Sequence, residues 1–514
     1  MLSTLRISSR KSDLARLQTY MVADEIKKIS PDIKIEFQFK ESLGDINLTD
    51  PLWKMPEKGV FTEDFNQDLL TEKTDLVVHS WKDLPTQNRG DLIIAATLPR
   101  ADQRDLLLIK KSDYNLILKT QEIKIFTSSP RRFFNIEPFL KSHFPFGLKR
   151  VDFSSVRGNV QTRLKKMMDS KEVHGLVLAK AALDRLLNNN FSDLKATRDY
   201  VHSVVQDCKW MILPLSANPN AAAQGSIAIE INGKRNDLKE FLQQINHSKT
   251  FEHTQGEREI LASHGGGCHQ KIGVTSLEHP YGKVLFTKGL TDQGSYLLTE
   301  VLNNSEQVKI KNKFSVNEIW NSTSNNLFFN RVDLSFDWSK YNSLSFGIFI
   351  TKTINLPKIN DDQLKWTSGT STWKKCAELG YWINGCQDQL GDQFPKNCDS
   401  LLLHETQWVK LTHDQAPETV NHQTVSNYKL VRNEQKFDFD GKKCFFWASS
   451  SLYLAAVKDH PEIRSLTHCC GLGQTALVIE NDLNLHLYKD TKKSLWTNLF
   501  IFCNYEQWRS YVTR

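Results

Sequence analysis

Short apolar runs alternate with helix-periodic segments over the first 200 residues, and this alternation constrains the fold more than any other feature. Leu5, Ile7 and Ser9 alternate with polar neighbours as a strand would, and Ser12 can cap a helix in the next segment. Further strand-like runs lie at 33–39, 75–79 and 92–97. The pattern predicts an α/β architecture with largely parallel or mixed sheets, in which ligands bind beyond the carboxyl ends of strands.

Length and charge narrow the class of protein. A chain of 514 residues is expected to form three to five domains. The net charge of +7 suits an anionic small molecule, and the basic residues lack long runs and interleaved aromatics, so no nucleic-acid partner is expected. No apolar run approaches the roughly 20 residues of a membrane helix. The nine cysteines and the absence of a signal-peptide pattern favour the cytoplasm.

One strand-like run ends in a charged pair. Lys82 and Asp83 follow the apolar residues 76–78. The lysine can hold a substrate carboxylate, and the aspartate can transfer a proton or stabilise a cation. On this segment alone a solvated loop pair is the better interpretation, because charged residues usually lie in loops for solubility.

Three other segments have the composition of anion sites. Hydroxyls at 127–129 precede Pro130 and two arginines, as at a helix start that binds a carboxylate or phosphate. Gly158 lies between Arg157 and Arg163, and Lys54 and Lys58 precede Gly59. Taken singly, each segment fits an ordinary helix cap or surface turn equally well.

The segment 264–270 presents one thiol among three glycines. Cys268 could serve there as a nucleophile, a metal ligand or a covalent attachment point. A zinc site would use His264, Cys268 and His269, but no paired Cys-x-x-Cys supports it, so no metal is expected. Walker A and G-x-G-x-x-G motifs are also absent, which disfavours nucleotide chemistry.

In their order, these segments resemble the hydroxymethylbilane synthase (porphobilinogen deaminase) family over residues 1 to about 305. The resemblance is carried by 6–12, 44–45, 54–61, 79–85, 127–132, 157–164, 222–225 and 266–268. It implies two lobes like those of periplasmic binding proteins, plus a small α/β domain that carries the cofactor. Lobe 1 would comprise 1–99 and 200–246, lobe 2 residues 100–199, and the cofactor-attachment domain 247–311. A C-terminal α/β region would span 335–514, beyond a junction near 303–335.

The resemblance also implies the chemistry. Cys268 would hold a dipyrromethane cofactor through a thioether, and four porphobilinogen molecules would be added head to tail with loss of ammonia, before water releases hydroxymethylbilane for tetrapyrrole (porphyrin, haem) biosynthesis. Asp83 would protonate the leaving amine and stabilise the resulting cation. The other cofactor ligands would be Asp45, Lys82, Thr127, Ser128, Ser129, Arg131, Arg132 and Gln224. The substrate ligands would be Arg10, Ser12, Lys54, Lys58, Arg157, Asn159, Arg163 and Arg185. The enzyme is expected to be a monomer.

The sequence departs from the family pattern at four positions, which are Trp81, Phe126, Ala182 and Ala223. They affect the expected loop geometry more than the reaction type, because none removes a proposed charge. A different class also remains open. A cytoplasmic binding protein for carboxylated ligands would need the cations but neither Asp83 nor Cys268.

The C-terminal region resembles uroporphyrinogen-III synthase in the order of its Ser-rich and Gly-x-Thr turns. Such a domain would make the chain a bifunctional fusion that cyclises its own product; the alternative is a noncatalytic interaction module. The candidate ligands are Ser368, Thr370, Ser449, Ser450 and Thr475, and ordinary helix capping explains the same residues. His468, Cys469 and Cys470 are expected to be buried structural residues, because tandem cysteines have poor metal-ligand spacing.

Overall fold

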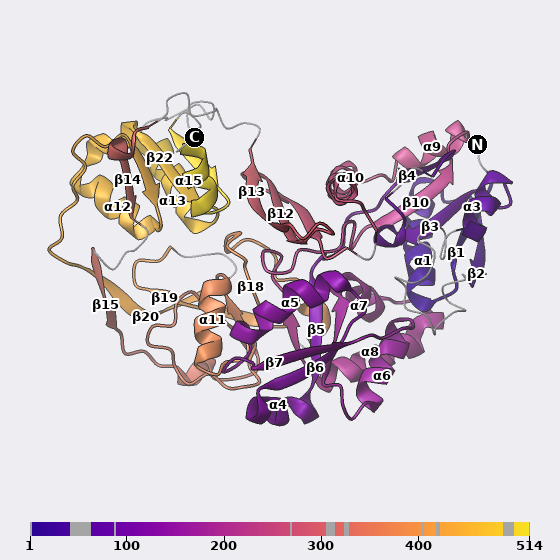
Figure 1. Cartoon of the computed structure of the whole chain (residues 1–514), viewed down its shortest axis with the longest axis horizontal. Coiled ribbons are helices and arrows are strands. Elements are labelled where there is room, and N and C mark those ends of the chain that lie inside the picture. The colour runs from indigo at the N-terminus through magenta and orange to yellow at the C-terminus, as the bar shows by residue number, and fades with distance from the viewer. Residues whose placement is uncertain are drawn as a thin grey trace. The chain divides into compact units, whose positions relative to one another are not determined.

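The computed structural model of the chain describes residues 3–41, 63–86, 89–267, 270–304, 314–322, 328–402, 405–417, 422–486 and 498–512. The chain divides into two compact units (Figure 1). The N-terminal unit comprises Met1–Ser276, Thr287–Leu298 and Asn397–Leu402. The C-terminal unit comprises Leu277–Phe286, Thr299–Lys396 and Leu403–Arg514. The fold class is α/β, as predicted.

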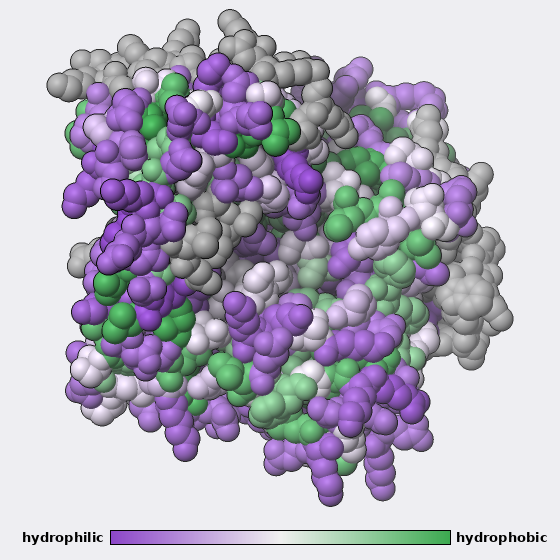
Figure 2. All heavy atoms as spheres, turned by 60° about the vertical axis from the view of Figure 1, so that its left-hand side comes forward, coloured by the Kyte–Doolittle hydropathy of each residue, from purple (hydrophilic) through white to green (hydrophobic). Residues whose placement is uncertain are grey.

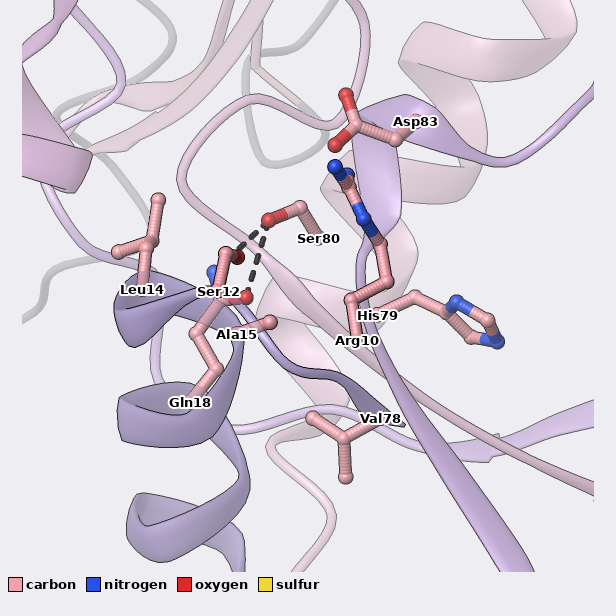
Figure 3. A pocket seen from close by; sticks show the side chains of 9 residues that line it. All are labelled: Arg10, Ser12, Leu14, Ala15, Gln18, Val78, His79, Ser80 and Asp83. Atoms are coloured by element: carbon pink, nitrogen blue, oxygen red, sulfur yellow. Dashed lines mark hydrogen bonds between the residues drawn. The ribbon is translucent and has the colours of Figure 1, made fainter. Parts of the chain in front are cut away.

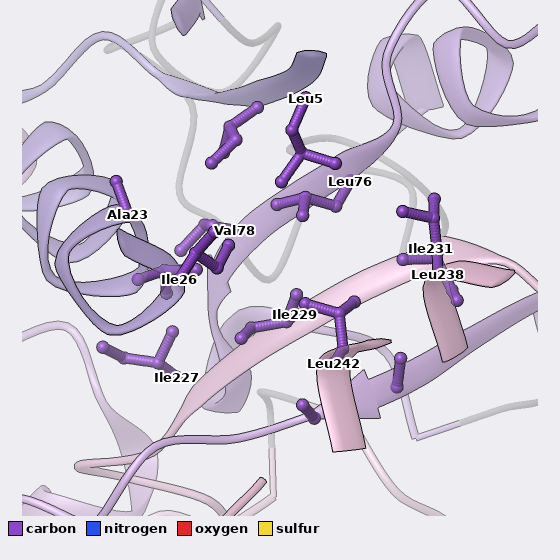
Figure 4. Packing of buried hydrophobic residues seen from close by; sticks show 14 of the residues in the cluster. Leu5, Ala23, Ile26, Leu76, Val78, Ile227, Ile229, Ile231, Leu238 and Leu242 are labelled. Carbon is purple, nitrogen blue, oxygen red and sulfur yellow. The ribbon is translucent and has the colours of Figure 1, made fainter. Parts of the chain in front are cut away.

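Lobe 1 is built on a five-stranded sheet of order β2-β1-β3-β10-β4. Strands β1 (Thr4–Arg10), β2 (Lys34–Lys40) and β3 (Leu76–Ser80) are parallel, whereas β10 (Ile227–Asn232) runs antiparallel between β3 and β4 (Leu92–Ala96). The helices are α1 (Asp13–Ile29), α3 (Glu63–Leu70) and α9 (Asn236–Gln243). Figure 4 shows side chains of both α1 and α9 in one apolar core with the central strands. This burial fixes α1, and with it the loop that follows β1.

Lobe 2 repeats the design with a sheet of order β7-β6-β8-β5-β9. Its strands are β5 (Asp105–Lys110), β6 (Glu122–Phe126), β7 (Arg150–Ser154), β8 (Gly175–Ala179) and β9 (Cys208–Ile212). Its helices are α4 (Tyr114–Thr120), α5 (Pro130–His143), α6 (Val160–Asp169), α7 (Lys180–Asn188) and α8 (Lys195–Gln206). The predicted boundary at 199/200 is wrong, because β9 pairs along its length with β5 and so belongs to lobe 2. The chain therefore crosses between the lobes at 97–104 and 213–226.

A helix and a three-stranded sheet occupy the stretch predicted to attach the cofactor. Helix α10 (Ser248–Ser263) precedes strands β11 (Gly273–His279), β12 (Gly282–Leu290) and β13 (Tyr296–Asn303), which lie in that order in the sheet. Helix α10 ends at the glycine-rich segment, so that segment begins from a rigid support.

The C-terminal unit contains two further sheets. One is fully parallel, in the order β14 (Ile319–Ser322), β21 (Cys444–Trp447), β22 (Thr467–Gly471) and β23 (Leu499–Phe502), and is accompanied by α12 (Ser450–Asp459), α13 (Gln474–His486) and α15 (Tyr505–Val512). The other has the order β15 (Phe329–Asp333), β20 (Gln423–Arg432), β19 (Gln407–His413), β16 (Phe346–Ile350), β17 (Lys365–Thr367) and β18 (Gly385–Cys386), with α11 (Thr370–Glu378). The expected start of this region at 335 is too late, because β14 and β15 already pair within these sheets.

The surface mixes polar and apolar side chains. On the face drawn in Figure 2, hydrophobic residues are scattered among hydrophilic ones. Within the described residues, every helix is too short or too polar to cross a bilayer.

Candidate active site

A pocket of about 70 Å³ lies in lobe 1 where β1 and β3 end. These strands are parallel neighbours, so their carboxyl ends bring Arg10 and Ser80 to the same edge of the sheet. Figure 3 shows the Arg10 guanidinium pointing toward the carboxylate of Asp83, with Ser12 nearby on the α1 side. The Asp83 side chain is exposed to solvent. The pocket therefore combines a cation with an accessible carboxylate.

Lys82 lies beside Asp83 in a 3₁₀ turn, Trp81–Asp83, directly after β3. Its Nζ donates a hydrogen bond to Oε1 of Gln224 (3.2 Å). Burial lowers the pKa of Lys82 to about 8; Asp83 opposes this shift, and Arg132 adds to it. The lysine is thus a poorly solvated cation at the site, which favours binding of a carboxylate.

Asp105, which the sequence analysis missed, connects several predicted cofactor ligands. Its carboxylate accepts hydrogen bonds from Arg131 (2.8 Å), Arg132 (2.7 and 3.1 Å) and Gln224 (2.9 Å). Burial alone would raise the pKa of Asp105, but the two arginines outweigh it and hold that pKa well below its usual range. Both guanidinium groups are buried, and each donates to Asp105.

Lobe 2 contributes a second group of cations. Arg163 on α6 donates from Nε to the carbonyl oxygen of Gly158 (2.7 Å). Burial lowers the pKa of Arg163 to about 10, with contributions from Arg132, Arg157 and Arg10, while the Asp83 carboxylate opposes the shift. Arg10 and Asp83 belong to lobe 1, so cations of both lobes share one electrostatic environment with Asp83.

Several predicted hydroxyl and amide ligands are engaged locally. Ser128 donates to the Val156 carbonyl (2.7 Å) and accepts from its N–H (2.9 Å), and the Thr127 hydroxyl accepts from the N–H of Ser129 (3.3 Å). Asn159 caps α6 by accepting from the N–H of Thr162 (2.9 Å). These contacts shape the loops at the ends of β6 and β7.

Arg185 and Ser129 complete the predicted ligands that the structure describes. Arg185 donates to the carbonyl oxygen of Gly225 (2.7 Å), and burial lowers its pKa to about 10. Ser129 is the N-cap residue of α5, without a side-chain cap hydrogen bond. The other predicted ligands, Asp45, Lys54, Lys58 and Cys268, lie outside the described residues.

The glycine segment that leads to Cys268 begins close to this site. Gly265, Gly266 and Gly267 all have left-handed φ angles, of 100°, 69° and 89°. A Cβ atom on Gly266 would lie 2.4 Å from Oγ1 of Thr86, so this position requires glycine. Thr86 is three residues beyond Asp83. The described part of the chain has no group of three His, Cys, Asp or Glu side chains suited to a metal ion.

The crossovers between the lobes are joined to α10 by Glu257. This buried carboxylate pairs with Arg100 through both oxygens (2.7 and 2.8 Å) and accepts from the N–H groups of Ala223 (2.9 Å) and Ser276 (2.7 Å). Sequence reasoning missed Glu257, although a glutamate beside apolar helix positions was visible in principle. Its partners lie far away in sequence, so no local pattern identifies them.

The departures from the family pattern have structural consequences at two positions. Trp81 is buried and packs edge-on against Phe251 of α10, with ring centroids 5.1 Å apart. Ala223 has a φ of 70°, in the left-handed region that glycine favours. Neither change displaces a proposed charge.

Together, the two lobes, the cations of both and the accessible carboxylate define a class: a two-lobed α/β protein whose site suits a ligand that carries carboxylates. The family model for "Porphobilinogen deaminase, dipyromethane cofactor binding domain" matches residues 5–240. The porphobilinogen deaminase of Synechococcus elongatus is 33% identical over 53% of this chain and 78% of that protein. The enzyme of Syntrophomonas wolfei is 36% identical over 56% and 84%.

An archaeal protein named "Probable porphobilinogen deaminase", from Saccharolobus islandicus, is 36% identical over 52% of this chain and 81% of its own length. The chain belongs to the porphobilinogen deaminase family. Its activity is that of a hydroxymethylbilane synthase, a transferase of tetrapyrrole biosynthesis with a dipyrromethane cofactor. Among solved structures, PhnD1 of Prochlorococcus marinus aligns with 47% of this chain and 83% of its own at 11% identity, but a TM-score of 0.28 supports no conclusion.

Proposed function

We propose that Asp83 is the proton-transfer group of this hydroxymethylbilane synthase and that the surrounding cations hold the carboxylates of the growing chain. The observation that carries the proposal is the position of Asp83. It is solvent-accessible, it faces Arg10 in one lobe, and it contributes to the electrostatic environment of Arg163 in the other. A carboxyl group in this position can exchange a proton with a bound substrate and stabilise positive charge on it.

The residues present fit the dipyrromethane cofactor. Its four carboxylates need cations, and its covalent attachment needs an accessible thiol. Lys82 supplies a poorly solvated cation, and Gly266, in the glycine segment that precedes Cys268, lies against Thr86, which is three residues beyond Asp83. When bound, the group supplies the pyrrole carbon that primes the chain. We assign its attachment to Cys268 and its carboxylates first to Lys82; Ser129, Arg131, Arg132, Gln224 and Asp45 remain predicted ligands of the cofactor.

The chemistry of Asp83 follows from losing an amine beside a carboxylate. Its carboxyl group gives a proton to the amino nitrogen of porphobilinogen, which leaves as ammonia. The substrate then carries positive charge, and the carboxylate stabilises that charge without reorganisation because it is already in place. The same oxygen afterwards takes the proton lost from the pyrrole carbon.

The contacts that the cations already make rank them as candidate ligands for the substrate carboxylates. Arg10 lines the pocket with Asp83, and Arg163 is within electrostatic reach of Asp83, Arg10 and Arg157. These three arginines are therefore the leading ligands for porphobilinogen carboxylates, together with Ser12, Lys54 and Lys58. Arg185 is a weaker candidate for a substrate ligand, because it already donates to the Gly225 carbonyl oxygen. The oxygen of Asn159 caps α6, so its NH₂ group is the part left for substrate.

Intact-protein mass spectrometry tests the attachment of the cofactor to Cys268, and turnover measurements test proton transfer by Asp83. We expect the full chain to carry an added mass of two pyrrole units, which Cys268→Ala removes. Asp83→Asn should keep the fold and lose at least 100-fold in kcat. Asp169→Asn, which alters only an exposed pair with Lys165 within α6, is the control and should retain activity. An active chain of unmodified mass, or near-normal turnover of Asp83→Asn, would exclude the respective role.

The partner and location assignments complete the proposal. Porphobilinogen is the substrate, the enzyme acts as a monomer in the cytoplasm, and neither nucleic acid nor membrane takes part. The supporting features are the scattered basic residues, the cysteine usage and the mixed surface. Size-exclusion chromatography with light scattering tests the monomer directly.

A second activity, uroporphyrinogen-III synthesis, is supported by the architecture of the C-terminal unit. The chain leaves the four-stranded sheet after β14, builds the six-stranded sheet, and returns at β21. The turns after β18 and β22 then meet, since a Cβ on Gly391 would lie 3.0 Å from Cα of Gly473. Parallel sheets bind ligands at such carboxyl ends. Ser368 and Thr370 follow β17, Ser450 follows β21 and Thr475 follows β22, while Ser449 already caps α12.

The full chain distinguishes this activity from a noncatalytic module. Incubated with porphobilinogen alone, a bifunctional chain releases uroporphyrinogen III. Accumulation of hydroxymethylbilane without uroporphyrinogen III would instead establish that the C-terminal unit is noncatalytic.

A further inference from the structure

We propose that Arg258 of α10 is a positioning residue for the catalytic turn: it fixes the backbone that carries Lys82 and Asp83 to the helix from which the Cys268 segment begins. The inference rests on the proposed role of Asp83. It adds a residue that does not touch substrate and acts through the geometry of the turn.

Three hydrogen bonds of Arg258 are directed at one short stretch of backbone. One terminal nitrogen donates to the carbonyl oxygens of Trp81 (3.3 Å) and Leu84 (3.0 Å), and the other donates to that of Pro85. These three residues flank Lys82 and Asp83 on both sides. The guanidinium fork is planar and rigid, so it fixes the orientation of the turn as well as its position.

Apolar packing and the glycine segment support the same junction. Trp81 packs on Phe251, which lies two turns from Arg258 on the same face of α10, and Gly266 lies against the Thr86 side chain. Hydrogen bonds from Arg258, an aromatic contact and the contact between Gly266 and Thr86 thus join α10 and the segment after it to residues 81–86.

The neighbouring Glu257 fixes α10 in the other direction. It binds Arg100 and Ala223, which lie on the two crossovers between the lobes. Helix α10 therefore connects the crossovers to the catalytic turn through two adjacent residues. Because the glycine segment that precedes Cys268 starts from the same helix, Arg258 links the start of that segment to the turn that carries Asp83.

Two substitutions separate positioning from folding. Arg258→Met keeps the aliphatic stem and removes every donor, whereas Arg258→Lys keeps a charge that can donate to the same carbonyl oxygens. We expect Arg258→Met to retain the covalent two-pyrrole addition and the KM for porphobilinogen, and to lose roughly 10- to 100-fold in kcat through misplacement of Asp83. Arg258→Lys should recover much of that loss.

The control is Arg198→Met, which removes a comparable arginine that donates to the Asn189 carbonyl within lobe 2 (2.9 Å). It should lower the melting temperature by a similar amount and leave kcat unchanged. A wild-type kcat in Arg258→Met, a loss matched by Arg198→Met, or an Arg258→Lys variant no better than Met would overturn the proposal. So would an Arg258→Met protein without the added mass, since Arg258 would then serve attachment.

Failure of this proposal is distinguishable from failure of the proposed function. The mass of the wild-type chain and the turnover of Asp83→Asn decide the function without reference to Arg258. If Asp83→Asn is inactive and Arg258→Met is fully active, only the positioning role is lost.

Discussion

At the scale of single residues, the site contains groups whose environment works against the folded state. Lys82 is a poorly solvated lysine, and Ala223 occupies a left-handed conformation. Perturbed groups concentrate at functional sites, because selection there acts on chemistry as well as stability. Substitutions of Lys82 and Ala223 measure how much each residue lowers the free energy of unfolding.

Replacing Ala223 by glycine should stabilise the protein. An alanine in the left-handed region costs about 1–2 kcal/mol, so its replacement by glycine removes this strain. The greater flexibility of glycine in the unfolded chain offsets part of the stabilisation. We therefore expect the free energy of unfolding to rise by roughly 0.5–1 kcal/mol in urea denaturation. Ala222→Gly, next to it and without a left-handed φ, is the control and should destabilise. A loss of stability in Ala223→Gly would show that the strain is compensated.

Lys82 predicts a pH dependence of stability whose sign follows from its pKa. The folded-state value of about 8 lies below the ordinary 10.5, so between these values the unfolded state binds more protons and stability rises with pH. Below pH 8 the full cost of the buried charge remains. In the Cys268→Ala background, Lys82→Met should therefore stabilise the protein by roughly 1–3 kcal/mol at pH 7. The gain should shrink from pH 8 toward 10.5, and a gain independent of pH would contradict this account.

At the scale of elements, charged residues fix helices to strands. Asp105 begins β5 and binds Arg131 and Arg132 in the first turn of α5, so one carboxylate joins the sheet to the helix at the cofactor end of lobe 2. The helix start predicted as an anion site is thus occupied by an anion from the protein itself.

Asp105→Asn should be strongly destabilising, because it leaves two buried guanidinium groups without their counterion. Breaking such a pair costs about 3–5 kcal/mol. Asp152→Asn serves as the control, since its partner Arg150 is largely exposed and such pairs contribute below about 1 kcal/mol. Thermal melts of both variants measure the difference. A similar, small shift in both would mean that water compensates the buried arginines.

At the scale of the N-terminal unit, polar contacts also join the lobes away from the crossovers. Asp193 of lobe 2 binds Arg16 and the Tyr20 hydroxyl (3.0 Å) of α1, and Asp13 of α1 accepts from Gln161 of α6 (2.6 Å). Each helix involved begins shortly after a predicted substrate ligand, α1 after Arg10 and α6 after Arg157. Separation of the lobes must break these contacts.

Asp193→Ala should make this separation easier with little loss of global stability. The pair is partly exposed, so the free energy of unfolding should fall by less than about 1 kcal/mol. Hydrogen exchange should nevertheless accelerate in α1 and α6. Asp169→Ala removes an exposed pair within α6 alone and should change neither lobe contact. Equal exchange in the two variants would show that the Asp193 contacts do not restrain the lobes.

Much of the fold could be predicted from local patterns. Alternating apolar residues marked β1, a short apolar run marked β3, and the helical spacing after Ser12 marked α1, because short-range patterns record which side chains are buried. The lobe boundary was missed because the pairing of β9 with β5 joins residues about 100 positions apart, and no local pattern encodes such pairing.

The sequence by itself determined which chemistry is available: the carboxylate of Asp83, the thiol of Cys268 and the cations around them, in an order specific to one family. Only the tertiary structure decided which charges are engaged and by what. Arg131 and Arg132 donate hydrogen bonds to Asp105. Arg258 donates to the carbonyl oxygen of Trp81, which lies 177 residues earlier in the sequence. The physical reason is that residue types fix what a group can donate or accept, whereas its partners depend on which distant segments folding brings within about 3 Å.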